Sequence, residues 1–240
     1  KNRDPRFYHD IVFDGFKYIN MTIAKEEDDY QFKYIQMYTG SNLRSSASQG
    51  CRTGYYCQKL VPHQANKYDG MYNWGGALQC DLPYMRLADL YLMYAEAGAA
   101  VQGANYKSSK LDLTAVDAIN VLRNRVDAGH VADKFVADQK KFMDEVRRER
   151  AVELAFEGFR WNDLQRWLLL TEYPYNIKTS QEFKRVGNYD LPKHDPRGAE
   201  VAGWSETRIV LRDFSEKHYL LPLKESDVYL YPEFGQNPGW

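Results

Sequence analysis

The sequence has little cysteine, no long hydrophobic run and no excess of charge of one sign. Its three cysteines form no C-x-x-C pair, and His63 is the histidine nearest to them, so the pattern does not favour a zinc site. Cys51 and Cys57 could close a small disulfide loop or remain thiols, and the sequence leaves both states open. No stretch reaches the roughly 18 apolar residues of a membrane span, and none has the pattern of a signal peptide.

Charge and motif content exclude further classes of protein. The formal net charge is -1, from 32 basic and 33 acidic residues, which gives no electrostatic case for binding nucleic acid. There is no G-x-S-x-G elbow, no glycine-rich phosphate loop, and no histidine in a triad pattern. Neither Asp28-Asp29 nor Asp195 lies in a dedicated calcium loop. We therefore predict no catalytic residue, no cofactor and no metal site.

Aromatic residues are abundant. They make up 15% of the chain, with 19 Tyr, 5 Trp and 11 Phe. Sugars present apolar C–H faces rimmed by hydroxyls, and aromatic rings with a polar rim suit such half-wet surfaces. Trp161 and Trp167 lie in a helical pattern, and we assign them to the core. The candidate ligand-binding residues are loop aromatics with polar neighbours, namely Tyr30, Tyr72, Trp74 and Trp204.

The chain divides into three segments by residue composition and apolar periodicity. Residues 1–80 read as loops with short strands, 81–170 as a helical core, and 171–240 as an irregular wrap with a closing segment. In the core, apolar spacing predicts a helix ended by Gly103, with its inner face formed by Leu87, Leu90, Tyr91, Tyr94 and Val101. The sequence therefore predicts a mainly α fold with long irregular loops and a few short strands.

Three further helices follow from capping and breaking signals. Thr114 to Asp117 resembles a capping box, and it should open a helix that stops at Gly129. A third helix should run from about Val136 to Gly158, and a short fourth from Arg160 to Leu170.

The third helix carries an unusual number of charges for a helix that is apolar nearly all round. Glu149, Glu153 and Glu157 recur at i, i+4 and i+8, so they repel one another unless cations meet them. Three carboxylates on one helix project the same way, and surrounding arginines would keep them ionised, which is unsuitable for a general acid. We predict a structural ion network of Arg86, Arg147, Glu149, Arg150, Glu153 and Glu157, with Arg123 or Arg125 as further partners.

Several segments, in the same order along the chain, resemble the SusD/RagB family of outer-membrane nutrient-binding lipoproteins. They are Asp4-Pro5-Arg6-Phe7, the segment from Met85 to Ala97, the helix from Ala118 to Arg125, the segment from Arg147 to Trp167, and Leu221-Pro222-Leu223 leading to Gln236-Asn237-Pro238-Gly239-Trp240. The resemblance covers residues 1–240 and matches the C-terminal half of the family. It implies a tetratricopeptide-like helical base, and it places the lipidated cysteine and the N-terminal half of the family ahead of residue 1.

The resemblance also implies a function. Family members hold glycans, or sometimes peptides, at the surface of Gram-negative bacteria, and deliver them to a TonB-dependent transporter of the SusC type. We therefore expect non-catalytic glycan binding at the outer membrane. Peptide capture of the RagB type, a carbohydrate-active enzyme and a scaffold that only docks to the transporter are the alternatives.

Overall fold

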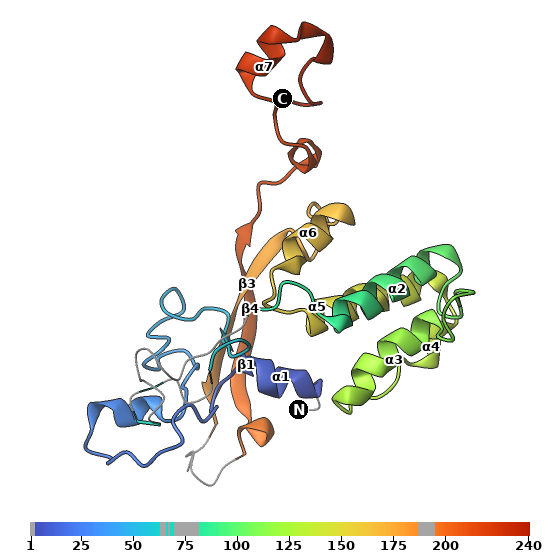
Figure 1. The fold of residues 1–240 in the computed structure, drawn as a ribbon. Coiled ribbons are helices and arrows are strands. Elements are labelled where there is room, and N and C mark those ends of the chain that lie inside the picture. The colour runs from blue at the N-terminus through green and yellow to red at the C-terminus, as the bar shows by residue number, and fades with distance from the viewer. Residues whose placement is uncertain (1–2, 63–65, 67, 70–81, 187–194) are drawn as a thin grey trace.

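The computed structural model describes residues 3–62, 66, 68–69, 82–186 and 195–240. A long two-stranded hairpin runs through the middle of the molecule (Figure 1). A block of helices lies on one side of this hairpin and the loops of the N-terminal region lie on the other, while the C-terminal residues form an arm that projects away from both (Figure 1).

The N-terminal region contains short elements joined by long loops. They are α1 (Pro5–Asp10), β1 (Ile11–Val12), the 3-10 helix η1 (Asp28–Phe32) and β2 (Tyr56–Cys57), and β1 pairs antiparallel with β2. The side chain of Asp4 caps α1 by accepting a hydrogen bond from the backbone N–H of Arg6. A small apolar core of Val12, Ile35 and Met37 packs against Phe183 of the hairpin, and this contact fixes the loops to the central strands.

The helical block contains the predicted helices with altered limits. It consists of α2 (Leu87–Val101), α3 (Ala115–Arg125), α4 (Asp133–Val136), α5 (Gln139–Glu153) and α6 (Phe159–Arg166). The capping box that opens α3 is confirmed, because Thr114 accepts from the N–H of Asp117 while the carboxylate of Asp117 accepts from the N–H of Thr114. The helix α3 ends at Arg125, four residues before Gly129, and α5 ends at Glu153 rather than at Gly158.

The buried face of α2 differs in part from the predicted one, although Tyr91 and Tyr94 pack against the core as expected. Leu87, Leu90 and Val101 are 63%, 48% and 70% exposed, whereas Ala88, Leu92, Ala95 and Ala99 are buried against α3 and α5. Small residues let the neighbouring backbones approach closely. A Cβ added at Gly98 would lie 2.7 Å from the ring of Tyr106 and 2.9 Å from the Cβ of Ala115. The apolar periodicity predicted the position of the helix correctly. It assigned mainly large apolar side chains to the buried face, whereas the structure buries the small ones together with Leu92.

The prediction of an irregular segment after residue 171 is wrong for its first part. The strands β3 (Ile177–Arg185) and β4 (Val201–Leu211) form a long antiparallel pair, in which Ile177 is opposite Leu211 and Arg185 is opposite Val201. The prolines and glycines that suggested irregularity are concentrated in the connection between the strands, which includes the 3-10 helix η2 (Pro196–Gly198). Polar residues in both strands weakened the alternating pattern by which strands are recognised.

The C-terminal arm contains η3 (Glu216–Tyr219), α7 (Glu225–Leu230) and η4 (Pro232–Phe234). It is attached to the body near α6, where the hydroxyl of Tyr219 accepts a hydrogen bond from the N–H of Leu170 at 2.9 Å. Trp161 of α6 makes an edge contact with Phe214 and is 50% exposed, so its predicted place in the core is wrong. None of the described helices is both long enough and apolar enough to cross a bilayer.

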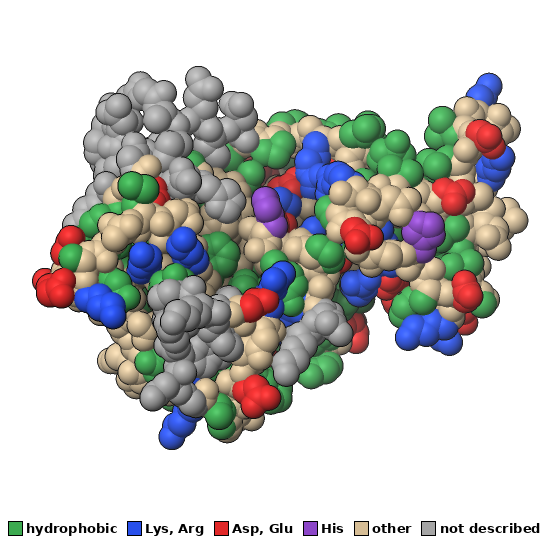
Figure 2. Space-filling model, turned by 90° about the horizontal axis from the view of Figure 1, so that it is seen from below, with side chains coloured by type: hydrophobic (Ala, Val, Ile, Leu, Met, Phe, Trp, Pro, Cys, Tyr) green, Lys and Arg blue, Asp and Glu red, His purple; other side chains and the backbone are tan. Residues whose placement is uncertain are grey.

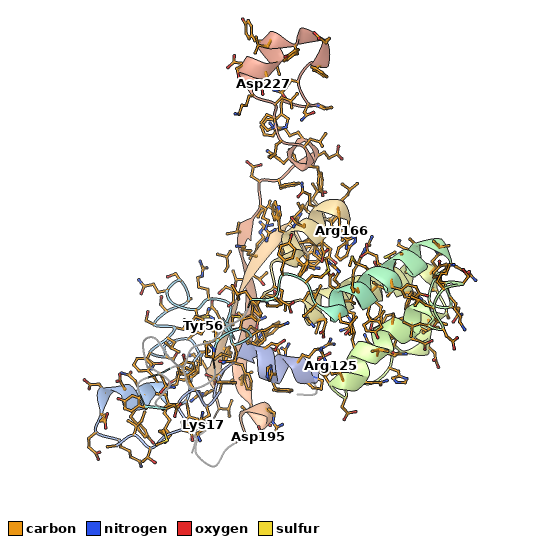
Figure 3. The ribbon with its side chains drawn as sticks, in the orientation of Figure 1. Lys17, Tyr56, Arg125, Arg166, Asp195 and Asp227 are labelled. Carbon is orange, nitrogen blue, oxygen red and sulfur yellow. The ribbon has the colours of Figure 1, made fainter. Side chains whose placement is uncertain are left out.

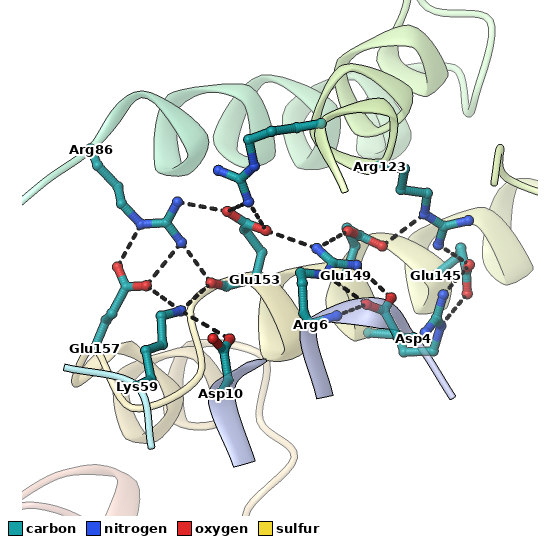
Figure 4. Close-up of polar contacts among 12 residues, drawn as sticks. Asp4, Arg6, Asp10, Lys59, Arg86, Arg123, Glu145, Glu149, Glu153 and Glu157 are labelled. Atoms are coloured by element: carbon teal, nitrogen blue, oxygen red, sulfur yellow. Dashed lines mark hydrogen bonds and ion pairs between the residues drawn. The ribbon is translucent and has the colours of Figure 1, made fainter. Parts of the chain in front are cut away.

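A buried row of carboxylates connects the helical block to the N-terminal region (Figure 4). We call this row the carboxylate spine; it consists of Glu145, Glu149 and Glu153 on α5, and Glu157 in the turn that follows α5. The guanidinium of Arg6 from α1 bridges Glu149 at 2.6 Å and Glu153 at 2.8 Å. The cations that meet the spine are Arg148 of α5 itself and, from other parts of the chain, Arg6, Lys59, Arg86, Arg123 and Arg125.

Glu153 lies at the centre of the carboxylate spine. Its side chain is 1% exposed and receives Arg6, Arg86 and Arg125 at 2.6 to 2.8 Å. Burial opposes the charged form and is the largest single influence on its pKa, but the hydrogen bonds from the three arginines together outweigh burial and lower that pKa. Glu145 and Glu157 are held in the same way, and the pKa of each is also below its ordinary value despite burial.

Two arginines predicted for this network lie elsewhere. Arg150 is buried and joins Asp89 of α2 to Asp163 of α6 at distances of 2.5 and 2.7 Å. Arg147 pairs with Asp144 at 3.3 Å and lies over the ring of Trp167. Residues two positions apart on a helix face directions about 200° apart, so Arg147 cannot reach the side of α5 that carries Glu149.

We predict that Glu153→Ala lowers the free energy of unfolding by about 3–5 kcal/mol, because it removes the buried carboxylate that Arg6, Arg86 and Arg125 share. Asp144→Ala on the same helix removes an exposed pair in which the aspartate is 62% exposed, and it should cost less than about 1 kcal/mol. Urea denaturation of both variants provides the measurement. Equal losses for the two variants would contradict the central place of Glu153.

We also predict a loss of stability in acid. The pKa values of Glu145, Glu153 and Glu157 are lowered from 4.5 in the folded protein, so the unfolded chain binds protons more readily. Their contribution is complete above about pH 4.5 and is lost as the pH falls through the folded-state values. Urea midpoints measured from pH 7 to pH 3 should therefore decrease most below that point, and Glu153→Ala should show a shallower decrease. Parallel curves for the two proteins would contradict the assignment.

Candidate functional site

Two cavities are candidates for a binding site, and they lie on different sides of α1. The first has a volume of about 510 Å³ and borders the carboxylate spine, with Arg6, Lys59, Arg86, Arg125 and Glu153 among its lining residues. In this region Arg125 lies between α3 and α1 (Figure 3).

The first cavity does not suit sugar binding or hydrolysis. Its described lining contains no Phe, Tyr or Trp on which a sugar could stack. Glu153 already receives three arginines, and its lowered pKa keeps it ionised, whereas a glycosidase needs one carboxyl that holds a proton at neutral pH. The arginines that line this cavity form ion pairs with Glu153 and thereby stabilise the fold.

The second cavity, which we call the aromatic pocket, has a volume of about 310 Å³. Three stretches of chain supply its walls: the N-terminal residues through Asp14, the turn at Gly54 and Tyr55, and the hairpin with its connection. Its aromatic lining is Phe7, Tyr8, Phe13, Tyr55, Phe183 and Trp204, and its polar lining is Arg3, Asp14, Gln181 and Arg197. This volume lies at the lower end of the range of about 300–1,000 Å³ for small-molecule sites.

The rings of the aromatic pocket support one another: Phe7 meets Tyr8 and Tyr55 edge to face, and Phe13 in a tilted arrangement. The centroid of Phe7 lies 5.4 Å from that of Tyr8, 5.5 Å from that of Phe13 and 5.6 Å from that of Tyr55. Aromatic pairs at such distances contribute about 0.5–1.5 kcal/mol beyond their buried area, so the floor of the pocket is held in place before a ligand arrives. Trp204 on β4 is 58% exposed, and its ring surface remains available.

The carboxylate of Asp14 at the edge of the pocket is engaged by its neighbours. Arg185 of β3 donates to it from Nε at 2.7 Å and from Nη2 at 2.9 Å, and the backbone N–H of Met37 donates at 2.7 Å. This bidentate pair joins the N-terminal region to β3 of the hairpin at the border of the pocket. Asp14 is the single carboxylate among the described lining residues, so the aromatic pocket has no pair of opposed carboxyls.

The predicted ligand-binding residues are not all gathered at this site. Trp204 lines the aromatic pocket, whereas Tyr30 lies half-buried in η1 and is not part of its lining. Tyr72 and Trp74 lie outside the described residues. Asp69, a polar neighbour of these two, accepts hydrogen bonds from the backbone of Asn20 and Met21, and therefore serves to hold the loop.

The cysteines, the possible metal ligands and the surface charges give no second candidate site among the described residues. Cys51 and Cys57 are free thiols that donate to the carbonyl oxygens of Tyr55 and Lys59, and Cys80 lies outside the described residues. Across the part of the chain that the structure describes, no three His, Cys, Asp or Glu side chains converge as metal ligands would. Basic and acidic side chains alternate over the face seen from below, without a broad area of one sign (Figure 2).

Sequence reasoning missed most of the aromatic pocket. Phe7 was noted only as part of the Asp4-Pro5-Arg6-Phe7 motif, and Phe13 and Tyr55 lie in loop sequence without a motif. One signal was available, because Phe7 directly follows Arg6 in the Asp4-Pro5-Arg6-Phe7 motif. On the short helix α1, Arg6 is directed to the carboxylate spine and Phe7 to the pocket.

Comparisons with known proteins define the class to which this chain belongs. Residues 1–240 match the sequence model of the SusD family, and the chain therefore belongs to that family. A comparison with curated proteins finds no match.

Solved structures share the fold. A crystal structure of a SusD-like protein from Bacteroides fragilis is similar, with a TM-score of 0.66 and 23% identity, covering 100% of this chain and 40% of that one. The structure of BT4246 is similar with a TM-score of 0.61 and 23% identity, covering 99% of this chain and 36% of that one. The chain thus spans well under half the length of these structural relatives.

We predict that Trp204→Ala leaves the fold intact. Because this ring is 58% exposed, its removal should change the free energy of unfolding by less than about 1 kcal/mol. Phe142→Ala, at a fully buried position in the helical core, should cost about 3–5 kcal/mol. Chemical denaturation of the two variants makes the comparison, and a loss at Trp204 as large as that at Phe142 would show that the tryptophan is structural.

Proposed function

We propose that this protein is a non-catalytic glycan-binding member of the SusD family, and that the aromatic pocket holds part of an oligosaccharide. The observation that carries the proposal is the arrangement of the lining, in which Trp204 and the rings of α1 surround a space with amide, guanidinium and phenol groups at its edge. Aromatic faces accept the C–H surfaces of a sugar, and the polar rim can hydrogen-bond its hydroxyls.

Binding without hydrolysis fits the distribution of carboxylates. Glycosidases place two carboxyl groups about 5–9.5 Å apart on either side of the bond they cleave. The described lining of the aromatic pocket contains Asp14 alone, and Arg185 already binds both of its oxygens. We therefore expect sugar to leave this site chemically unchanged.

The cellular role follows from membership of the family. We propose that the protein works at the outer-membrane surface of a Gram-negative bacterium as a lipoprotein, and that it delivers its ligand to a SusC-type TonB-dependent transporter. In this setting α2, α3 and α5 would form part of a tetratricopeptide-like helical base, with the aromatic pocket carried by the loops and the hairpin outside it. The affinity should be modest, because a shallow site buries little of the ligand and still orders it.

The other candidate aromatics can extend the same surface. We propose that Tyr30, Tyr72 and Trp74 contact further sugar units of a longer chain. Because Tyr30 lies apart from the lining of the aromatic pocket, its contribution should grow with the length of the oligosaccharide.

Calorimetric titration of the protein with a panel of neutral and acidic oligosaccharides tests the proposal. We expect at least one member to bind, and Trp204→Ala to weaken its binding about tenfold or more, which corresponds to about 1.4 kcal/mol. Trp161→Ala is the matched control, because Trp161 is 50% exposed on α6, outside the lining of the pocket.

The outcomes of this titration separate the alternatives. Equal losses in the two tryptophan variants, with folding intact, would contradict the assignment of the site. Binding of peptides in place of sugars would favour peptide capture, release of shorter sugars would favour an enzyme, and no binding of either class would favour a docking scaffold.

A further inference from the structure

We infer that the sugar held by the aromatic pocket is an acidic one, and that Arg3 binds its carboxylate or sulfate group. This inference rests on the proposed glycan-binding function and adds the chemical class of the ligand. It comes from the balance of charge within the lining, which has one cation more than its local carboxylates neutralise.

Two of the three charged lining residues have carboxylate or guanidinium partners of their own. Asp14 is bound by Arg185 through two hydrogen bonds. Arg197 pairs with Asp195 of the same connection, at 2.8 Å between Nη2 and Oδ2, and its guanidinium lies over the ring of Tyr8 at 5.9 Å. Figure 3 places Asp195 at the lower end of the hairpin, below α1.

Arg3 differs from these two residues. Its guanidinium lies over the ring of Phe7, 4.6 Å from the centroid, and Nη2 donates a long hydrogen bond of 3.3 Å to the hydroxyl of Tyr55. Among the described residues no carboxylate lies within ion-pair distance of it. A guanidinium has five N–H donors, so most of the donor edge of Arg3 is not used by the described protein groups.

The geometry suits an anion carried on a ring-shaped ligand. The contact with the ring of Phe7 limits the rotation of the Arg3 guanidinium, and the Arg3 side chain is exposed to solvent. A planar carboxylate, or two oxygens of a sulfate, can accept a pair of parallel N–H donors from the guanidinium. A sugar seated on the adjacent rings would bring such a group to Arg3, whereas a simple anion would lack the apolar contact.

The experiment uses pairs of ligands that differ only in charge. Short oligomers of galacturonate, glucuronate and mannuronate are titrated into the protein beside their methyl esters, and a sulfated disaccharide is titrated beside its unsulfated form. We expect at least one charged ligand to bind ten times more tightly than its neutral partner, with a preference that decreases as salt is raised from 50 to 300 mM. The carboxylate and sulfate pairs distinguish the two sources of negative charge.

Variants assign the preference to a residue. Arg3→Gln should abolish the preference for the charged ligand while leaving the affinity for the neutral partner within twofold of wild type. Arg160→Gln is the control, because Arg160 is likewise exposed and stacks over a ring, that of Tyr175, but it lies on α6 outside the lining of the pocket.

Each outcome bears on one of the two claims. If neutral and charged partners bind equally in every pair, or if Arg3→Gln keeps the preference, the acidic-sugar inference is wrong while glycan binding stands. If no sugar of any kind binds, the proposed function fails, and the present inference fails with it.

Discussion

The buried ion pairs of Glu153 are the interaction on which the rest of this structure depends. One carboxylate with 1% exposure receives guanidinium groups from the N-terminal helix, from the residue before α2 and from the end of α3. Removing a charge from water is expensive, and the cost is offset here only because each oxygen has close partners. The geometry is therefore demanding, and it ties the N-terminal helix α1 to α2, α3 and α5, which also share an apolar core.

The aromatic pocket benefits from this rigidity. Arg6 anchors α1 to the carboxylate spine, and Phe7, the next residue, contributes to the floor of the pocket. On the other side of the pocket, the bidentate pair of Asp14 and Arg185 holds the N-terminal region against β3. The exposed residues of the aromatic pocket are thus carried on a framework whose own charges are satisfied internally, so these residues can differ without loss of the fold.

What the sequence could predict depended on how local each signal was. The capping box at Thr114 and Asp117 uses residues three positions apart, and α3 began where it was expected. The repeat of Glu149 and Glu153 showed that cations were required, and it pointed to arginines. It could not identify Arg6, which lies 147 positions from Glu153, or Lys59, because nothing in the local pattern specifies a distant partner.

The predictions for the hairpin, for the buried face of α2 and for the pocket failed because each depends on contacts between distant parts of the chain or on a weak local pattern. The hairpin was overlooked because its strands carry many polar residues, and because Pro192 and Pro196 in the connection dominated the local composition. On α2 the chain packs its alanines inward, a choice set by how closely α3 and α5 approach. For the pocket, Trp204 was recognisable as an aromatic residue with polar neighbours, although it lies on β4 and not in a loop, whereas Phe13 and Tyr55 line the pocket only because three distant stretches of the chain meet there.

The span between Arg6 and its partners on α5 also has a consequence for biosynthesis. A contact that joins residues 143 and 147 positions apart must close a very long loop, and such contacts form late in folding. The ion pairs between α1 and α5 can therefore form only after α5 has been synthesised and folded. Because the aromatic pocket is lined by residues of α1 and also of β4, its lining is complete only after β4 has been synthesised.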